Sequence, residues 1–200
     1  MKFLSIFPFI SFLFLVISLL ARIVYLRKKG IKVSSKSGEK PKILILLFLA
    51  FGLIFLIWLA ELASLAFQVS LSVLPGFLTN SLLNAQWLRY AGALLIFISL
   101  AFWVLTLFHF RFSLRFGLDK QNQGELISSG IFSYSRNPFF LSINLFFAGL
   151  ALLHTSIFFI VMALLTLISI HFFILKEEKF LRKHYGDAYK KYQEKAGRYF

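Results

Sequence analysis

The chain has 200 residues and a formal net charge of +14; 59% of its residues are hydrophobic, 15% are charged and 27 are phenylalanine. A soluble domain typically carries about 25% charged residues, so this composition and a mean hydropathy of +0.80 exclude an ordinary soluble protein and indicate an integral membrane protein. The absence of cysteine excludes disulfides, thiolate nucleophiles and cysteine-based metal sites.

The first apolar run, residues 3–21, is long enough to cross a bilayer once. A cleaved signal peptide is the alternative, but its basic residues normally precede the apolar run, and here only Lys2 does. We therefore expect a retained helix whose N-terminus lies outside. Residues 22–42 contain eight Lys/Arg and one acid, which predicts a cytoplasmic loop, because such loops carry an excess of basic residues.

A second span is predicted over residues 43–67 and a third over residues 88–110, joined by an uncharged outer loop that a Pro-Gly pair interrupts. Glu61 lies inside the second span and has two interpretations. It lines a functional cavity within the membrane, or it lies near the outer interface, where it is solvated or paired with a neighbour. Its closeness to the polar loop favours the second.

Residues 111–136 form the first substantial polar segment, and Pro138 suits the first turn of a new helix. The next 37 residues contain no Lys, Arg, Asp or Glu. This run is too long for one span, so it predicts a helical hairpin with spans over residues 139–153 and 157–175. The tail, residues 176–200, predicts an amphipathic helix that lies on the membrane or on the protein.

These elements predict a single all-α membrane domain, residues 1–200, with about five transmembrane helices, N-out and C-in. The three proposed cytoplasmic segments hold 20 of the 22 Lys/Arg residues. This clustering beside apolar runs also argues against nucleic acid as a partner and in favour of the lipid bilayer. The oligomeric state has no signal in the sequence.

Charged groups lie at both ends of the predicted hairpin. Arg136 directly precedes it, and Glu177 and Glu178 directly follow it, so an antiparallel hairpin would bring the arginine and the carboxylates to the same interface. One interpretation is a structural salt bridge between the ends of the hairpin. The other is a binding pocket, in which carboxylates take an ammonium or ribose hydroxyls and the guanidinium takes a carboxylate or phosphate.

The segment GIFSYSRNPFF, residues 130–140, resembles the G-x-Y-x-x-x-R-H-P-x-Y motif of the isoprenylcysteine carboxyl methyltransferases and their relatives. The tail KEEKFLRKHYGDAYKKYQEKAGRYF resembles that family's E-E-x-x-L-x-x-x-[FY]-G-x-x-Y-x-x-Y-x-x-x-x-x-R segment. The resemblance covers about the last third of the chain. The matching positions are Gly130, Arg136, Pro138, Glu177, Glu178, Leu181, Tyr185, Gly186, Tyr189, Tyr192 and Arg198.

This resemblance implies a multi-span enzyme that binds S-adenosylmethionine in a pocket facing the cytoplasm, built from residues 111–138 and 176–200. The implied reaction is methyl transfer to a lipid-linked or small apolar acceptor, as in carboxyl O-methylation of an isoprenylcysteine-like substrate. The implied catalytic residues are Arg136 and Glu178. The implied cofactor-binding residues are Gly130, Phe132, Arg136, Asn137, Pro138, Phe140, Glu177 and Glu178.

Three residues depart from the family motif: Asn137 replaces its histidine, and Phe132 and Phe140 replace its tyrosines. These changes leave open a non-enzymatic accessory protein, or a family member that keeps the fold without catalysis. A transporter is a weaker alternative because Glu61 is the only charged residue well inside a span. A metal site is not expected, because metal-binding spacing is absent from the four histidines, His109, His154, His171 and His184.

Overall fold

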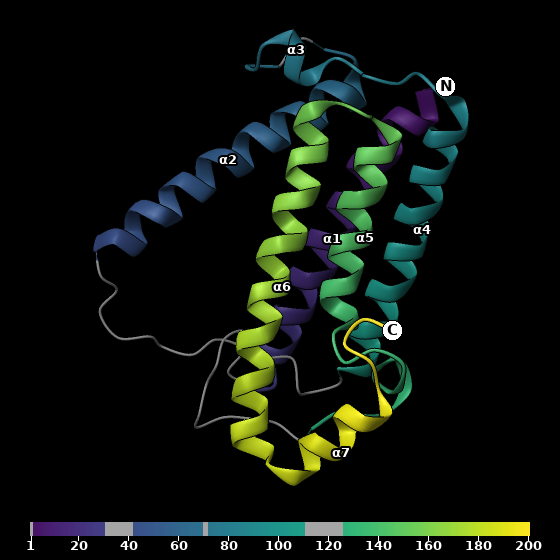
Figure 1. Ribbon diagram of the computed structural model, residues 1–200. Coiled ribbons are helices and arrows are strands. Elements are labelled where there is room, and N and C mark those ends of the chain that lie inside the picture. Colours follow the sequence, from purple (N-terminus) through teal and green to yellow (C-terminus); the bar gives the residue numbers. More distant parts are fainter. Residues whose placement is uncertain (1, 31–41, 70–71, 111–125) are drawn as a thin grey trace.

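The computed structural model describes residues 2–30, 42–69, 72–110 and 126–200, and their regular secondary structure is helical, as predicted (Figure 1). Four helices are long and apolar enough to cross a membrane: α1, α2, α4 and α6. The elements in chain order are α1 (Lys2–Lys28), α2 (Lys42–Phe67), α3 (Gly76–Thr79), α4 (Gln86–His109), the 3₁₀ helix η1 (Gly130–Ser133), α5 (Pro138–Leu153), α6 (Ile157–Tyr185) and α7 (Asp187–Lys195).

The remaining predicted span corresponds to α5, an apolar helix of 16 residues. It is shorter than the about 20 residues that a bilayer crossing normally requires. α5 forms an antiparallel hairpin with α6 and packs along α4, while α2 contacts α1 towards its C-terminal end and its N-terminal end lies away from the bundle (Figure 1). Four spans therefore meet the length criterion within the described residues, and the fifth prediction falls on a shorter helix.

The core of the bundle is built from large apolar side chains of α1, α2, α4, α5 and α6. Trp58 is fully buried and meets Phe12 edge to face, with 4.9 Å between the ring centroids. One buried hydrogen bond joins α4 to α5, from Ser99 Oγ to the carbonyl oxygen of Ser142 at 2.7 Å. Because lipid removes much of the hydrophobic drive between helices, such close packing and polar contacts hold the bundle together.

Two helices extend further than the sequence predicts. α1 runs through residues 22–28, which the sequence predicts as part of a loop, and α6 runs through Glu177 and Glu178 to Tyr185. The glycines with positive φ that follow these two helices are Gly30 and Gly186, and basic side chains stabilise the C-terminal turn of a helix. The tail is therefore not one amphipathic helix from residue 176, but the last turns of α6 followed by α7.

Gly186 has φ +54°, a conformation that favours glycine, and there the chain reverses from α6 into α7. The reversal lays α7 against η1. Phe132, Tyr189 and Tyr192 are buried together in this contact. The Tyr192 hydroxyl donates a hydrogen bond of 2.6 Å to the carbonyl oxygen of Phe132, so the tail is tied to the segment that precedes the hairpin.

Glu61 lies at the opposite end of the bundle and is only 3% exposed. Its Oε1 accepts a hydrogen bond of 2.6 Å from the Ser72 hydroxyl. At this end, a ring nitrogen of His154 also lies 2.9 Å from the carbonyl oxygen of Thr79. Glu61 thus has a neighbour as its partner, as the second interpretation of this residue proposed.

Gly92 of α4 and Gly149 of α5 bring the two helix backbones into close contact. A Cβ atom added at Gly92 would lie 2.5 Å from the carbonyl oxygen of Gly149, which is backbone and cannot move aside. We predict that Gly92→Ala lowers the free energy of unfolding by about 1–3 kcal/mol, as over-packing does. Thermal unfolding in detergent measures this. Gly52→Ala is the control, because nothing lies within 4 Å of that position; equal losses in both variants would contradict the prediction.

Tyr192→Phe tests the contact between α7 and η1. The change leaves the buried Phe132 carbonyl without its donor, and we predict a loss of about 1–3 kcal/mol in the free energy of unfolding. Tyr134→Phe is the matched control, because Tyr134 is 75% exposed, and it should change stability by less than about 0.5 kcal/mol. Chemical denaturation of both variants gives the comparison. A Tyr192→Phe protein as stable as wild type would show that the hydroxyl contact contributes nothing.

Candidate functional site

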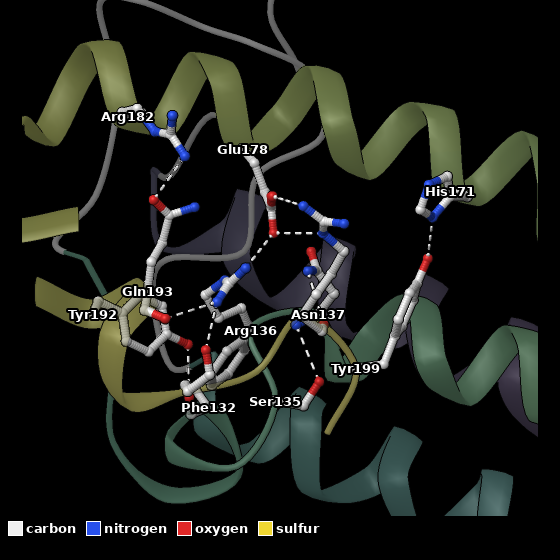
Figure 2. A network of polar contacts seen from close by, with 12 residues as sticks. Phe132, Ser135, Arg136, Asn137, His171, Glu178, Arg182, Tyr192, Gln193 and Tyr199 are labelled. Carbon is white, nitrogen blue, oxygen red and sulfur yellow. Dashed lines mark hydrogen bonds and ion pairs between the residues drawn. The ribbon is translucent and has the colours of Figure 1, made fainter. Parts of the chain in front are cut away.

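Arg136 lies in the short link between η1 and α5, and its side chain is 9% exposed. One terminal nitrogen of its guanidinium donates to the carbonyl oxygens of Gln193 and Ala196, and the other lies 2.8 Å from Glu178 Oε1. Its backbone N–H donates to the carbonyl oxygen of Gly197 at 2.9 Å. The end of the chain therefore wraps around this arginine and fixes its direction (Figure 2).

Glu178 lies on the inner face of α6, beyond the apolar part of the helix, and is 5% exposed. Its Oε2 lies 2.9 Å from a terminal nitrogen of Arg198, and its Oε1 accepts from Nε of the same arginine at 3.2 Å. We call Arg136, Glu178 and Arg198 the ion cluster. A carboxylate this deeply buried needs such partners, and removing one partner of a buried pair typically costs about 3–5 kcal/mol.

The ion cluster carries one negative and two positive charges, so its formal net charge is +1. The hydrogen bond to Glu178 raises the pKa of Arg198, which keeps this guanidinium cationic. Two guanidiniums around a single carboxylate leave charge and N–H donors for a further anion. The Nε of Arg136 is buried and has no hydrogen-bond partner within the described part of the chain.

Asn137 precedes the first residue of α5 and is 7% exposed. Its side-chain nitrogen donates to the carbonyl oxygen of Arg198 at 3.1 Å. Pro138 then begins the helix, where its missing N–H has no cost, and it is fully buried. Asn137 thus positions the backbone of residues 196–200, which we call the C-terminal strap.

His171 lies two turns before Glu178 on α6, on the same face of the helix. Its Nδ1 lies 3.0 Å from the hydroxyl oxygen of Tyr199, and the two rings stack with an interplanar angle of 26°. Burial raises the pKa of the Tyr199 hydroxyl. This contact attaches the C-terminal strap to α6 at a second point, on the side facing the apolar part of the helix (Figure 2).

Two further tyrosines, Tyr189 and Tyr192, lie on α7 and pack against η1 next to the ion cluster. Burial raises the pKa of Tyr189 to about 12, and it also raises the pKa of Tyr192. Both hydroxyls are therefore neutral at physiological pH. They act as hydrogen-bonding and packing groups, and neither is suited to be a base.

The structure brings together only part of the set of site residues predicted from the sequence. Arg136, Asn137 and Glu178 meet at the ion cluster. Glu177 is half-buried, next to Glu178 but about 100° around the helix from it, and has no ion pair within the described residues. Burial and the neighbouring charge of Glu178 raise the pKa of Glu177 to about 7, so it offers a partly ionised carboxyl group beside the net positive cluster.

The other predicted residues lie around this centre. Gly130 has φ +64°, and a Cβ there would overlap the ring of His109. Phe132 is 6% exposed and packs under α7. Phe140 lies on α5 and meets Phe173 of α6, with 5.3 Å between the ring centroids. Gly130 and Phe132 shape the floor of the site through packing, and Phe140 faces the apolar surface of the hairpin.

Sequence reasoning named Arg198 as a motif position but did not assign it to the site. Its position in the tail motif, after the two glutamates, was the available signal. The carbonyl oxygens of Gln193, Ala196 and Gly197 carried no signal, because every residue has a carbonyl group. In the described ranges, no group of three or more His, Asp or Glu side chains could hold a metal ion.

A family model described as phospholipid methyltransferase matches residues 87–188, just over half of the chain. The match includes α4, η1, α5 and α6, and therefore Arg136, Glu177 and Glu178; Arg198 lies beyond it. No curated protein matches the chain. The apolar helices and this match together indicate an integral membrane protein. The chain belongs to the phospholipid methyltransferase family, the family of the isoprenylcysteine carboxyl methyltransferase-like membrane methyltransferases.

Proposed function

We propose that this protein transfers a methyl group from S-adenosylmethionine to a lipid or lipid-linked acceptor at the ion-cluster end of the α5–α6 hairpin. One observation carries the proposal. Within a chain of the phospholipid methyltransferase family, two guanidiniums and two adjacent carboxylates gather where the apolar hairpin ends. These charged groups are complementary to the zwitterionic amino acid part of S-adenosylmethionine, which has one carboxylate and one ammonium group.

The residues divide the binding between them. Arg136 and Arg198 would hold the cofactor's carboxylate, because the cluster has a net positive charge and Arg136 has an unused buried donor among the described residues. Glu177 would take the ammonium or a ribose hydroxyl, because its carboxylate is in no described ion pair. Glu178 already contacts both arginines, so its role would be to hold the two guanidiniums in position.

When bound, S-adenosylmethionine supplies a methyl group on a sulfonium, which departs as a neutral thioether. The protein's task is mainly positional: it holds the acceptor in line with that methyl group and excludes competing water. A carboxylate acceptor is already ionised at neutral pH and needs no general base. Tyr189 and Tyr192 stay neutral and are not suited to act as bases, which is consistent with a site that works by positioning the acceptor.

The acceptor we propose is the carboxylate of an isoprenylcysteine-like lipid. Phe140 and Phe173 border the site on the apolar surface of the hairpin, where a hydrocarbon chain can approach from the bilayer. We further propose that this end of the bundle faces the cytoplasm, because α1, α6 and the tail all place basic residues there.

The alternative is a family member that keeps the fold without catalysis. The burial of Glu178 between two arginines favours it, because the same contacts would serve as a structural connection between the ends of the hairpin and the C-terminal strap. Ligand binding separates the two functions, since a purely structural cluster has no reason to recognise the cofactor.

Calorimetric titration of the detergent-purified protein with S-adenosylmethionine and S-adenosylhomocysteine tests the proposal. We predict binding that Glu177→Gln weakens by at least about tenfold, or 1.4 kcal/mol, with no change in thermal stability, because the ion cluster remains intact. Glu194→Gln on the exposed surface of α7 is the matched control and should bind like wild type. A folded wild-type protein that binds neither compound at millimolar concentration would make the cluster structural and end the methyltransferase proposal.

A further inference from the structure

We propose that His171 and Tyr199 bind the carboxylate of the lipid acceptor, so that this pair is the acceptor site next to the ion cluster (Figure 2). The inference rests on the proposed function, in which the ion cluster holds the cofactor, and it adds the residues that recognise the second substrate. Neither residue is a position of the two motifs that the chain shares with the family, and Tyr199 lies beyond the matched segment, residues 87–188.

The hydrogen bond between the two side chains leaves one proton donor over. A neutral imidazole has one N–H and one unprotonated nitrogen, and a tyrosine hydroxyl both donates and accepts. If the Tyr199 hydroxyl donates to His171 Nδ1, the imidazole N–H is at Nε2; if Nδ1–H donates to the hydroxyl oxygen, the tyrosine O–H is left over. In either case the pair presents one donor that has no partner within the described residues, and a carboxylate is a strong acceptor for it.

This donor is both held in place and within reach of a ligand. His171 and Tyr199 are each half-buried, whereas Glu178 of the ion cluster is buried. The stacking of the two rings, with 6.3 Å between their centroids, fixes their relative orientation. Burial raises the pKa of the Tyr199 hydroxyl, so it keeps its proton at physiological pH. A carboxylate would therefore meet a preorganised donor, which lowers the entropic cost of binding.

The face of α6 that carries His171 continues into the membrane as an apolar surface. Three apolar residues lie seven, four and three positions before His171 and therefore share its face of the helix. These residues are Leu164, Leu167 and Ile168, and each is about half exposed. A hydrocarbon chain can pack along them while its polar end reaches His171. This arrangement fits a lipid acceptor whose carboxylate lies at the end of an apolar chain.

The spacing along α6 suits two substrates that meet end to end. His171 and Glu178 lie about 10 Å apart along the helix axis. In S-adenosylmethionine the carboxylate carbon and the methyl carbon are about 6 Å apart when the amino acid chain is extended, and a near-attack acceptor oxygen lies about 3 Å further. The adjacent residues Arg198 and Tyr199 of the C-terminal strap contact α6 at these two points. A cofactor carboxylate at the ion cluster would therefore direct its methyl group towards the pair.

Charge favours a carboxylate over an amine at the pair. The neighbouring ion cluster has a formal net charge of +1, which attracts an anion and repels an ammonium headgroup. A donor to one carboxylate oxygen leaves the other oxygen free to form the bond to the methyl carbon, so no proton has to move. An aminophospholipid would instead have to lose a proton before its nitrogen could accept the methyl group.

Equilibrium binding of N-acetyl-S-farnesylcysteine and of its uncharged carboxamide tests the pair without turnover. The detergent-purified full chain is first saturated with S-adenosylhomocysteine, which has no methyl group to transfer. We predict that the wild-type protein binds the carboxylate at least tenfold more tightly than the carboxamide, because the charge-assisted hydrogen bond is lost in the latter. The double variant His171→Phe/Tyr199→Phe keeps both rings and removes the donor. Its preference should fall at least fivefold, while its affinity for S-adenosylhomocysteine changes less than twofold.

The matched control is His184→Phe/Tyr134→Phe, which makes the same chemical changes at two exposed positions and should keep the preference within twofold. His171→Gln supplies a second test, because a carboxamide side chain also donates and accepts, and it should keep the preference within about threefold. An unchanged preference in the double variant, an equal loss in His171→Gln, or tighter binding of phosphatidylethanolamine than of the carboxylate lipid would overturn the proposal. A wild-type protein that does not bind S-adenosylhomocysteine would contradict the proposed function instead, so the two failures are distinguishable.

Discussion

The arrangement of the site depends on the pairing of a single buried carboxylate. Glu178 can remain ionised in its apolar surroundings only because Arg136 and Arg198 reach it from two other segments of the chain. Arg136 must therefore lie directly before α5, and the chain must turn back at Gly186 so that the C-terminal strap passes over the end of the hairpin. The carbonyl oxygens of Gln193 and Ala196 then accept from the other terminal nitrogen of Arg136, so the pairing of one carboxylate specifies the path of the last fifteen residues, 186–200.

The parts of this arrangement that follow from periodicity and helix geometry could be predicted from the sequence. Apolar runs of sufficient length predicted the long helices, and Pro138 marked the start of α5. An uncharged run of 37 residues predicted a hairpin, and an antiparallel hairpin necessarily returns its two ends to one interface. The contact between Arg136 and Glu178 is a consequence of that return, which is why the sequence could indicate it without knowledge of any side-chain position.

Other features depend on tertiary contacts that leave no local pattern. Charged residues suggested that α1 and α6 end early, but a helix continues past the membrane boundary where no glycine or proline stops it and its side chains reach water. The sequence gives no reason why Glu178 and not Glu177 faces the arginines, since adjacent residues differ by about 100° in direction and the rotation of α6 is set by its packing. The structure also shows that η1 uses the backbone carbonyl of Phe132 to bind the tail, so the hydroxyl that this position lacks relative to the family motif is not needed for that contact.

One residue connects α1 to the packing beneath the ion cluster. Phe110, directly after α4, packs against Leu26 of α1 and meets Phe132 edge to face, with 5.2 Å between the ring centroids. Phe132 in turn packs against Tyr189 and Tyr192 of α7. The position of α1 therefore constrains the packing beneath α7, because buried side chains in contact cannot move independently. In this arrangement α1 does more than add a span: through Phe110 it supports the segment that positions Arg136.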